Sequence, residues 1–210
     1  MENSVMLLCD IGNTSYHFYD GVHEKKEDAA TFDPRTLKEK VYYICVNPAV
    51  LQKLSPLANW VNLERHVDRS RYYETMGIDR IMACEAIKSG IIIDAGSAIT
   101  VDKVQDGRFM GGFIYPGVRA MEQTYKNISS ALDYSFNYKV DLDKMPKNSQ
   151  DAISYGYLKP LQAEVLSHNT ELILTGGDAS KLACVFPRAT IDELLLFGGM
   201  QKIIQRAKLC

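Results

Sequence analysis

The sequence has no long apolar run, no basic block and no cysteine cluster, and each absence excludes a class of protein. No apolar stretch approaches the roughly 20 residues that a membrane-spanning helix needs. The formal net charge is −2, from 24 basic and 26 acidic residues, and no basic stripe indicates a nucleic-acid partner. The first residues also lack the basic region of a signal peptide. We therefore expect a soluble, cytoplasmic protein with neither a membrane nor a nucleic acid as partner.

The cysteines are few, odd in number and scattered, and no two of them form a CxxC pair. This pattern favours reduced thiols over a disulfide framework or a zinc site. The five are Cys9, Cys45, Cys84, Cys184 and Cys210. With 210 residues, 46% of them hydrophobic, the chain can build one large domain or two small ones.

The sequence does contain a short internal repeat. "LLCDIGNT" begins at residue 7 and "IIIDAGSA" at residue 91, and each joins an apolar strand to a second strand through Asp-x-Gly. Each segment therefore predicts a β-hairpin, with Asp10 or Asp94 just before its tip. Glycine lets the backbone approach a ligand there, and neighbouring N–H groups can face an anion. One copy would suit an ordinary turn. Two copies favour phosphate binding, with Mg²⁺ between carboxylate and phosphate.

A third glycine turn, "LTGGDA", occupies residues 174–179. It predicts a strand, a Gly-Gly turn and a helix. The glycines could let the chain lie flat against a nucleoside. The alternative is a short connection in which Asp178 caps the following helix.

Strands followed by helices occur twice along the chain, which indicates two α/β halves. In the first half we expect strands near 5–10, 15–21 and 41–46, a weak helix over 49–60, and a helix that Asp79 caps and Gly90 ends. In the second half we expect three strands over 90–117 with a hairpin at Asp106-Gly107. Two helices follow, the later one kinked or broken by Pro160. Residues 193–208 predict a final strand, glycine turn and helix.

Five motifs together resemble a known family. DIGNT, GIDR, DAGSAITVD, GGFIYPG and TGGDA occur here in the order typical of the type III pantothenate kinases, which are part of the actin, heat-shock ATPase and sugar-kinase superfamily. The resemblance implies two similar ribonuclease-H-like domains, 1–88 and 89–210, with a nucleotide cleft between them. It also implies ATP-dependent phosphorylation of pantothenate to 4′-phosphopantothenate, the first step of coenzyme A biosynthesis, by a homodimer.

The resemblance assigns residues to the nucleotide. Ser97 stands where the family usually has threonine, and it keeps a hydroxyl for phosphate. Asp94 corresponds to a ligand of a monovalent cation, K⁺ or NH₄⁺, and Asp10 would bind Mg²⁺ directly or through water. The remaining ATP-binding residues lie along the first hairpin and are Asp10, Ile11, Gly12, Asn13, Thr14, Ser15, Tyr16 and His17.

The resemblance also assigns residues to the acceptor. Asp79 corresponds to the general base that takes the proton of a primary alcohol, although the local sequence alone favours a helix cap. Arg80 corresponds to a contact for the substrate carboxylate, although alone it suggests a surface charge. Gly77 and Ile78 belong to the same motif. A substrate-contacting tyrosine is expected before it, either Tyr72 or Tyr73, of which we take Tyr73.

Ser149, at the start of a predicted helix, matches a further substrate-binding position, with an ordinary N-cap as the alternative. Two other functions stay open, a kinase for another small alcohol and a kinase-fold transcriptional regulator. Loss of Asp10 or Asp79 would favour the regulator, and both residues are present.

Overall fold

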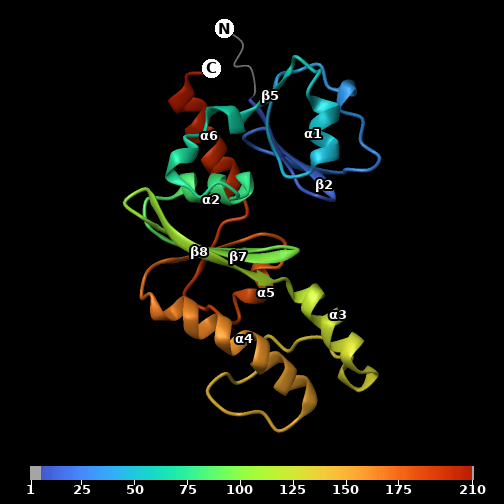
Figure 1. Ribbon diagram of the computed structural model, residues 1–210, viewed down its shortest axis with the longest axis vertical. Coiled ribbons are helices and arrows are strands. Elements are labelled where there is room, and N and C mark those ends of the chain that lie inside the picture. Colours follow the sequence, from blue (N-terminus) through green and yellow to red (C-terminus); the bar gives the residue numbers. More distant parts are fainter. Residues whose placement is uncertain (1–5, 210) are drawn as a thin grey trace. The chain divides into compact units, whose positions relative to one another are not determined.

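A computed structural model describes residues 6–209, and these form two compact units (Figure 1). The first contains the described residues up to Ile87 together with the segment that starts at Leu194, and the second is Lys88–Glu193. No helix among residues 6–209 is both long and apolar enough to cross a membrane. Four free cysteines lie in this range, and Cys210 lies outside it.

The first unit is built on a five-stranded sheet with the order β3-β2-β1-β4-β5. Strands β1 to β3 form an antiparallel meander, and β4 and β5 run parallel to β1. Every residue of β4 is buried, as expected for an apolar strand with neighbours on both sides. The strands are β1 (Leu7–Ile11), β2 (Ser15–Tyr19), β3 (Glu24–Asp28), β4 (Val41–Cys45) and β5 (Trp60–Asn62).

Helices cover both faces of this sheet. On one face, side chains of β1 and β2 pack with Val50 and Leu54 of α1 (Pro48–Leu54). On the other, Phe197 of α6 (Leu195–Ala207) packs against His17 and Tyr19. Helix α6 also packs along α2 (Ile78–Ala86). The short 3-10 helices are η1 (Pro34–Thr36), η2 (Leu63–His66) and η3 (Arg69–Arg71).

The second unit repeats the strand plan of the first. Its sheet has the order β10-β9-β6-β7-β8, so three antiparallel strands are again followed by two parallel ones. The predicted hairpin at Asp106-Gly107 is present, and both residues have positive φ. The strands are β6 (Gly90–Ala95), β7 (Ala98–Gln105), β8 (Arg108–Pro116), β9 (Leu172–Thr175) and β10 (Thr190–Ile191). The expected α/β class with two similar domains is confirmed.

The core of the second unit lies between its sheet and α4 (Ser149–Ser167), whose Tyr157, Leu158 and Val165 are buried against it. The other helices are α3 (Val118–Ile128), η4 (Ser130–Leu132) and α5 (Ala179–Leu182). Helix α4 continues through Pro160, so of the two predicted alternatives the break is wrong and the kink stays a prediction. Buried side chains on both sides of the exposed proline offset the missing hydrogen bond.

The C-terminal segment differs most from expectation. A strand and a glycine turn were predicted within 193–208, inside a second domain that ran to residue 210. The structure instead has one helix, α6, which belongs to the first unit. Gly198 and Gly199 lie within this helix. A Cβ at Gly199 would lie 1.9 Å from the Met82 carbonyl oxygen, so glycine allows α6 to approach α2 closely.

Candidate active site

The first Asp-x-Gly motif forms the tip of the β1–β2 hairpin, as predicted. The Gly12 N–H donates to the Ser15 carbonyl across 3.0 Å and closes the turn. The Asn13 carbonyl accepts from Asn47 Nδ2 at 3.2 Å, and the Thr14 carbonyl accepts from the Ala29 N–H at 2.9 Å. The tip is thus held from two directions, while the side chains of Asn13 and Thr14 are exposed. This is a preformed loop with polar groups at its end.

Strand alternation decides which hairpin side chains can reach a ligand. Ile11 and Tyr16 are fully buried, and the Tyr16 ring packs 4.8 Å from the Phe32 ring between centroids. Burial raises the pKa of Tyr16 to about 12. These two predicted ATP-binding residues can therefore offer only their main chain. His17, paired in register with Asp10, lies on the opposite face, where its Nε2 is 2.7 Å from Glu24 Oε2.

The GIDR motif forms the first turn of α2, but not with the cap that was predicted. Gly77 is the N-cap, Asp79 is the second helical residue, and the helix ends at Ala86, before Gly90. Asp79 Oδ1 accepts from the Arg80 N–H at 2.8 Å, so the carboxylate folds back over the helix N-terminus. A Cβ at Gly77 would lie 2.4 Å from that oxygen, which explains the glycine.

Arg80 is not a surface charge, because only 5% of it is exposed. Its guanidinium donates to the Tyr73 hydroxyl and lies over the Tyr73 ring, 5.7 Å from the centroid. The Tyr72 hydroxyl instead donates to Glu85 Oε1 at 2.9 Å. Burial, with Glu85 adding to it, raises the pKa of Tyr72 well above its usual range. Tyr73, 43% exposed, is therefore the tyrosine of the pair that lies beside Arg80 at the surface.

In the second unit the structure brings three of the motifs together. Asp94 at the end of β6 pairs with Thr175 on β9, so TGGDA begins beside the second Asp-x-Gly hairpin. The Asp178 N–H donates to the Ala95 carbonyl at 2.9 Å. Gly176, with φ of +85°, comes so close that a Cβ there would lie 2.3 Å from Asp94 Oδ1. Gly117, which ends GGFIYPG, packs equally closely on the Ser97 carbonyl.

The second Asp-x-Gly hairpin and TGGDA line a cavity of about 390 Å³, together with two residues that follow GGFIYPG. Its wall offers the Ser97 hydroxyl, the exposed Arg119 side chain and the Asp178 carboxylate, which Lys181 pairs at 2.7 Å. Hydroxyl, guanidinium and glycine backbone form a lining that suits a phosphate or a nucleoside. The lining residues are Ala95, Gly96, Ser97, Arg119, Ala120, Gly177 and Asp178.

Sequence reasoning missed two members of this cavity. Arg119 lies in the first turn of α3, two residues beyond GGFIYPG, and that offset was the only available signal. Asp178 was considered only as a cap, but its side chain makes no capping bond to α5. Ser149 is the first residue of α4, with Asn148 as the N-cap, and it is not part of the cavity wall.

The donor set for a metal is sparse. Residues 6–209 contain no group of three or more His, Cys, Asp or Glu side chains that could hold an ion. Asp10 and Asp94 each bring one half-buried carboxylate at a strand end. This fits Mg²⁺ held mainly by phosphate oxygens and water, with one or two carboxylates. It does not resemble an all-protein metal cage.

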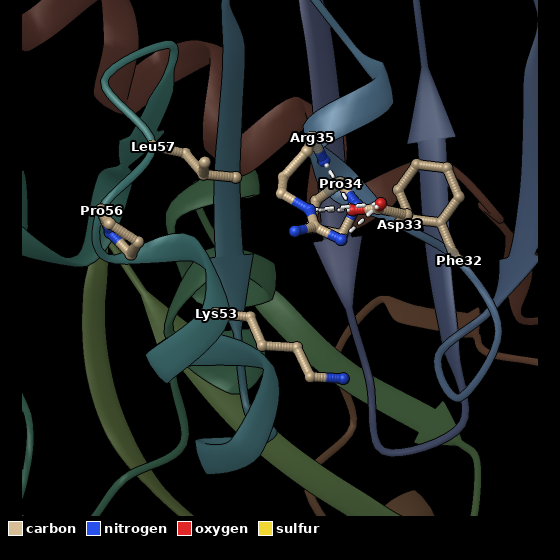
Figure 2. Close-up of a pocket in the computed structure, with 7 residues that line it drawn as sticks. All are labelled: Phe32, Asp33, Pro34, Arg35, Lys53, Pro56 and Leu57. Atoms are coloured by element: carbon tan, nitrogen blue, oxygen red, sulfur yellow. Dashed lines mark hydrogen bonds and ion pairs between the residues drawn. The ribbon is translucent and has the colours of Figure 1, made fainter.

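A second cavity, of about 470 Å³, lies in the first unit on the side of α1 (Figure 2). Arg35 Nη2 and Asp33 Oδ2 pair in its wall at 2.9 Å. Figure 2 shows this pair and, separately, the Lys53 side chain of α1, which lines the same cavity. None of the five motifs contributes a residue to it. The nucleotide is therefore not assigned to this cavity.

Comparison with known proteins agrees with the motifs. The sequence model of the family described as type III pantothenate kinase matches residues 58–168. A type III pantothenate kinase of Sulfurimonas denitrificans is 61% identical over 98% of this chain and 100% of its own length. One of Campylobacter jejuni is 40% identical over 95% of this chain and 97% of its own.

Solved structures agree as well. A conserved Campylobacter jejuni protein, assigned provisionally to the Baf family of transcriptional activators, has a TM-score of 0.86 and 37% identity over 98% of this chain and all of its own. A protein provisionally named 2-dehydro-3-deoxygalactonokinase from Sinorhizobium meliloti shares the fold, with a TM-score of 0.58 and 12% identity over 96% of each chain. Full-length similarity at 61% identity, added to five ordered motifs, shows that this chain belongs to the type III pantothenate kinase family.

Proposed function

We propose that this protein transfers the γ-phosphoryl group of ATP to the primary hydroxyl of pantothenate, giving 4′-phosphopantothenate and ADP. This is the first step of coenzyme A biosynthesis. The observation that carries the proposal is that the second Asp-x-Gly hairpin and TGGDA line one cavity, with Gly117 at the end of GGFIYPG packed on the Ser97 carbonyl. The names of the full-length relatives support pantothenate as the acceptor.

Backbone and hydroxyl groups of the Asp-x-Gly hairpin in each unit would bind phosphate. In the second unit, Ser97 would donate to a phosphate oxygen and Arg119 would neutralise part of its charge, while the Gly176-Gly177 turn would lie against the nucleoside. In the first unit, Gly12, Asn13, Thr14 and Ser15 would face the phosphates. Asp10 would hold Mg²⁺, which would supply positive charge to offset that of the phosphates. Asp94 would hold K⁺ or NH₄⁺.

The acceptor would be held at the start of α2. Arg80, fixed against Tyr73, presents a planar guanidinium that can pair with the carboxylate of pantothenate. Asp79 would take the proton of the primary hydroxyl as its oxygen attacks the γ-phosphorus and ADP leaves. Proton transfer to a positioned base is typically worth roughly 10²–10⁴-fold in rate. Gly77 and Ile78 form the same turn, and Ser149 would contact a polar end of the substrate.

The family resemblance also implies a cytoplasmic homodimer. Sedimentation of the purified protein tests the oligomeric state, with a monomer at micromolar concentration as the contrary result.

The decisive experiment is an assay of the purified full-length protein with ATP, Mg²⁺ and pantothenate. We expect ADP release that depends on pantothenate, and a product whose mass is that of the phosphorylated acid. ADP release only with another alcohol would instead favour the kinase for a different substrate. The description of the Campylobacter jejuni structure as a transcriptional activator keeps a regulator as the second candidate. DNA binding without turnover of any alcohol would favour it.

A further inference from the structure

A buried carboxylate lies behind the proposed acceptor site. Glu85, in the last turn of α2, is only 8% exposed. Its Oε1 accepts from Arg71 Nη1 at 2.8 Å and from the Tyr72 hydroxyl at 2.9 Å. Its Oε2 accepts from Arg206 on α6. One carboxylate thus ties α2 to two different parts of the chain.

Arg71 and Tyr72 immediately precede Tyr73. On the other side of Tyr73, Arg69 Nη1 donates to the carbonyls of Glu74 at 3.4 Å and Met76 at 3.2 Å. Segment 69–77 is therefore bonded to α2 through the two residues before Tyr73. After Tyr73, the segment is bonded to its own beginning through Arg69. Tyr73 lies between these two attachments, and its hydroxyl accepts from Arg80.

Apolar packing contributes little to the position of this segment. Between residues 64 and 77 only Met76 is buried, and η3 is a single turn. Polar attachments must therefore determine where Tyr73 lies. A whole buried charged network can often be replaced by apolar residues of similar volume without loss of stability. A purely stabilising role would thus not require a carboxylate here.

We propose that Glu85 is a positioning residue for the acceptor: it holds Arg71 and Tyr72, and so sets Tyr73 against the guanidinium of Arg80. The inference rests on the proposed function. Loss of the carboxylate releases segment 69–77 from α2, so Arg80 loses the neighbour that orients its guanidinium. The three side chains that bond Glu85 all belong to the first unit and lie outside the nucleotide motifs, so we expect the effect to fall on the acceptor.

The test compares Glu85→Gln and Tyr72→Phe with Arg206→Ala as the matched control. Tyr72→Phe removes one hydrogen bond to Glu85 from segment 69–77. Arg206→Ala removes the hydrogen bond from α6 to Glu85 and leaves segment 69–77 bonded to Glu85. The KM for pantothenate, the KM for ATP and the melting temperature are measured for each full-length variant. The parent enzyme is assayed first, so that failure of pantothenate turnover in the parent counts against the proposed function alone.

We expect the KM for pantothenate to rise about tenfold in Glu85→Gln and Tyr72→Phe, as for a lost hydrogen bond to a charged group. The KM for ATP should stay within about twofold of the parent value, and Arg206→Ala should change neither KM. If Glu85→Gln does not fold, Tyr72→Phe alone decides the matter. Unchanged KM values, parallel rises for both substrates, or the same pantothenate effect in Arg206→Ala would overturn the inference.

Discussion

The guanidinium of Arg80 donates to the hydroxyl of Tyr73 and lies 5.7 Å from the centre of its ring. The arginine is buried and the tyrosine beside it is partly exposed, so an aromatic neighbour fixes the guanidinium just beneath the surface. A buried guanidinium needs partners for its donors, because leaving them unpaired is costly. The pair therefore presents a fixed cation, which suits recognition of a carboxylate.

Arg80→Lys should raise the KM for pantothenate by about tenfold or more. Lysine keeps the positive charge. However, its ammonium lacks the planar set of donors with which a guanidinium can bond Tyr73 and a carboxylate at the same time. The KM for ATP should stay near the parent value. Arg108→Lys, at an exposed position on β8, is the control. Equal pantothenate KM values in Arg80→Lys and the parent would exclude Arg80 as the carboxylate contact.

Asp79→Asn should lower turnover by roughly 10²–10⁴-fold, because the amide cannot accept the proton of the attacking hydroxyl. Stability should change by no more than about 1 kcal/mol, since Asp79 is not the N-cap and loses only its charge at the helix N-terminus. Both substrates should still bind, because the lost interaction belongs to the transition state. Turnover and melting are measured together, and near-parental turnover would end the role of Asp79 as general base.

Local features of the fold could be predicted from sequence. Both Asp-x-Gly hairpins and the Asp106-Gly107 turn depend on residues close in the chain, and all three are present. The place of α6 could not be predicted. Lys202 on α6 donates to the Ala86 carbonyl, 116 residues away in the chain, and no local pattern encodes such a contact. The glycine pair in α6 suggested a turn, because its packing partner on α2 was unknown.

The candidate site shows the same division. The order of the motifs indicated which residues belong together. Two of those motifs line the cavity of the second unit, and Gly117 of a third packs on the Ser97 carbonyl. The burial of Arg80 and the place of Arg119 in that cavity depend on tertiary packing. The cap assigned to Asp79 failed for a local reason. Glycine can begin a helix without a side-chain cap, and here the carboxylate two residues later occupies the space beside Gly77.

Asp10→Asn should abolish most turnover while the protein stays folded. A neutral amide cannot offset the charge of Mg²⁺, so metal-dependent phosphate positioning is weakened. Asp20→Asn is the control in the same unit, since Asp20 lies in the β2–β3 turn and accepts from the N–H groups of Val22 and His23. Turnover is measured over a range of Mg²⁺ concentrations. Parental activity in Asp10→Asn would make Asp10 a turn residue only.

Tyr16→Phe should stabilise the first unit by about 1 kcal/mol, because the buried Tyr16 hydroxyl has no hydrogen-bond partner within residues 6–209. The pKa of Tyr16 is raised from 10.0 to about 12 in the folded state. The stability linked to its neutral form is therefore complete below pH 10 and is lost as the pH rises through about 12. Melting at pH 8 and at about pH 11 checks both points. The phenylalanine variant should lose less stability between the two than the parent, and an equal or larger loss would contradict this origin.

Gly176→Ala should disrupt the cavity of the second unit. Gly176 has φ of +85°, and a Cβ there would lie 2.3 Å from Asp94 Oδ1 and 2.7 Å from the Ala95 carbonyl oxygen. The turn must therefore move away from the hairpin that carries Asp94 and Ser97. We expect a loss of about 1–3 kcal/mol in the free energy of unfolding, from backbone strain together with the clash. ATP binding should weaken with it, because Ala95, Gly96 and Gly177 line the same cavity.

Gly177→Ala is the matched control for stability, since a Cβ at Gly177 meets nothing within 4 Å. Denaturant unfolding gives the stability of each variant, and ATP titration gives its affinity for the nucleotide. Equal stability of both variants, with parental ATP affinity in Gly176→Ala, would show that the close approach of TGGDA to Asp94 is not needed for the nucleotide site.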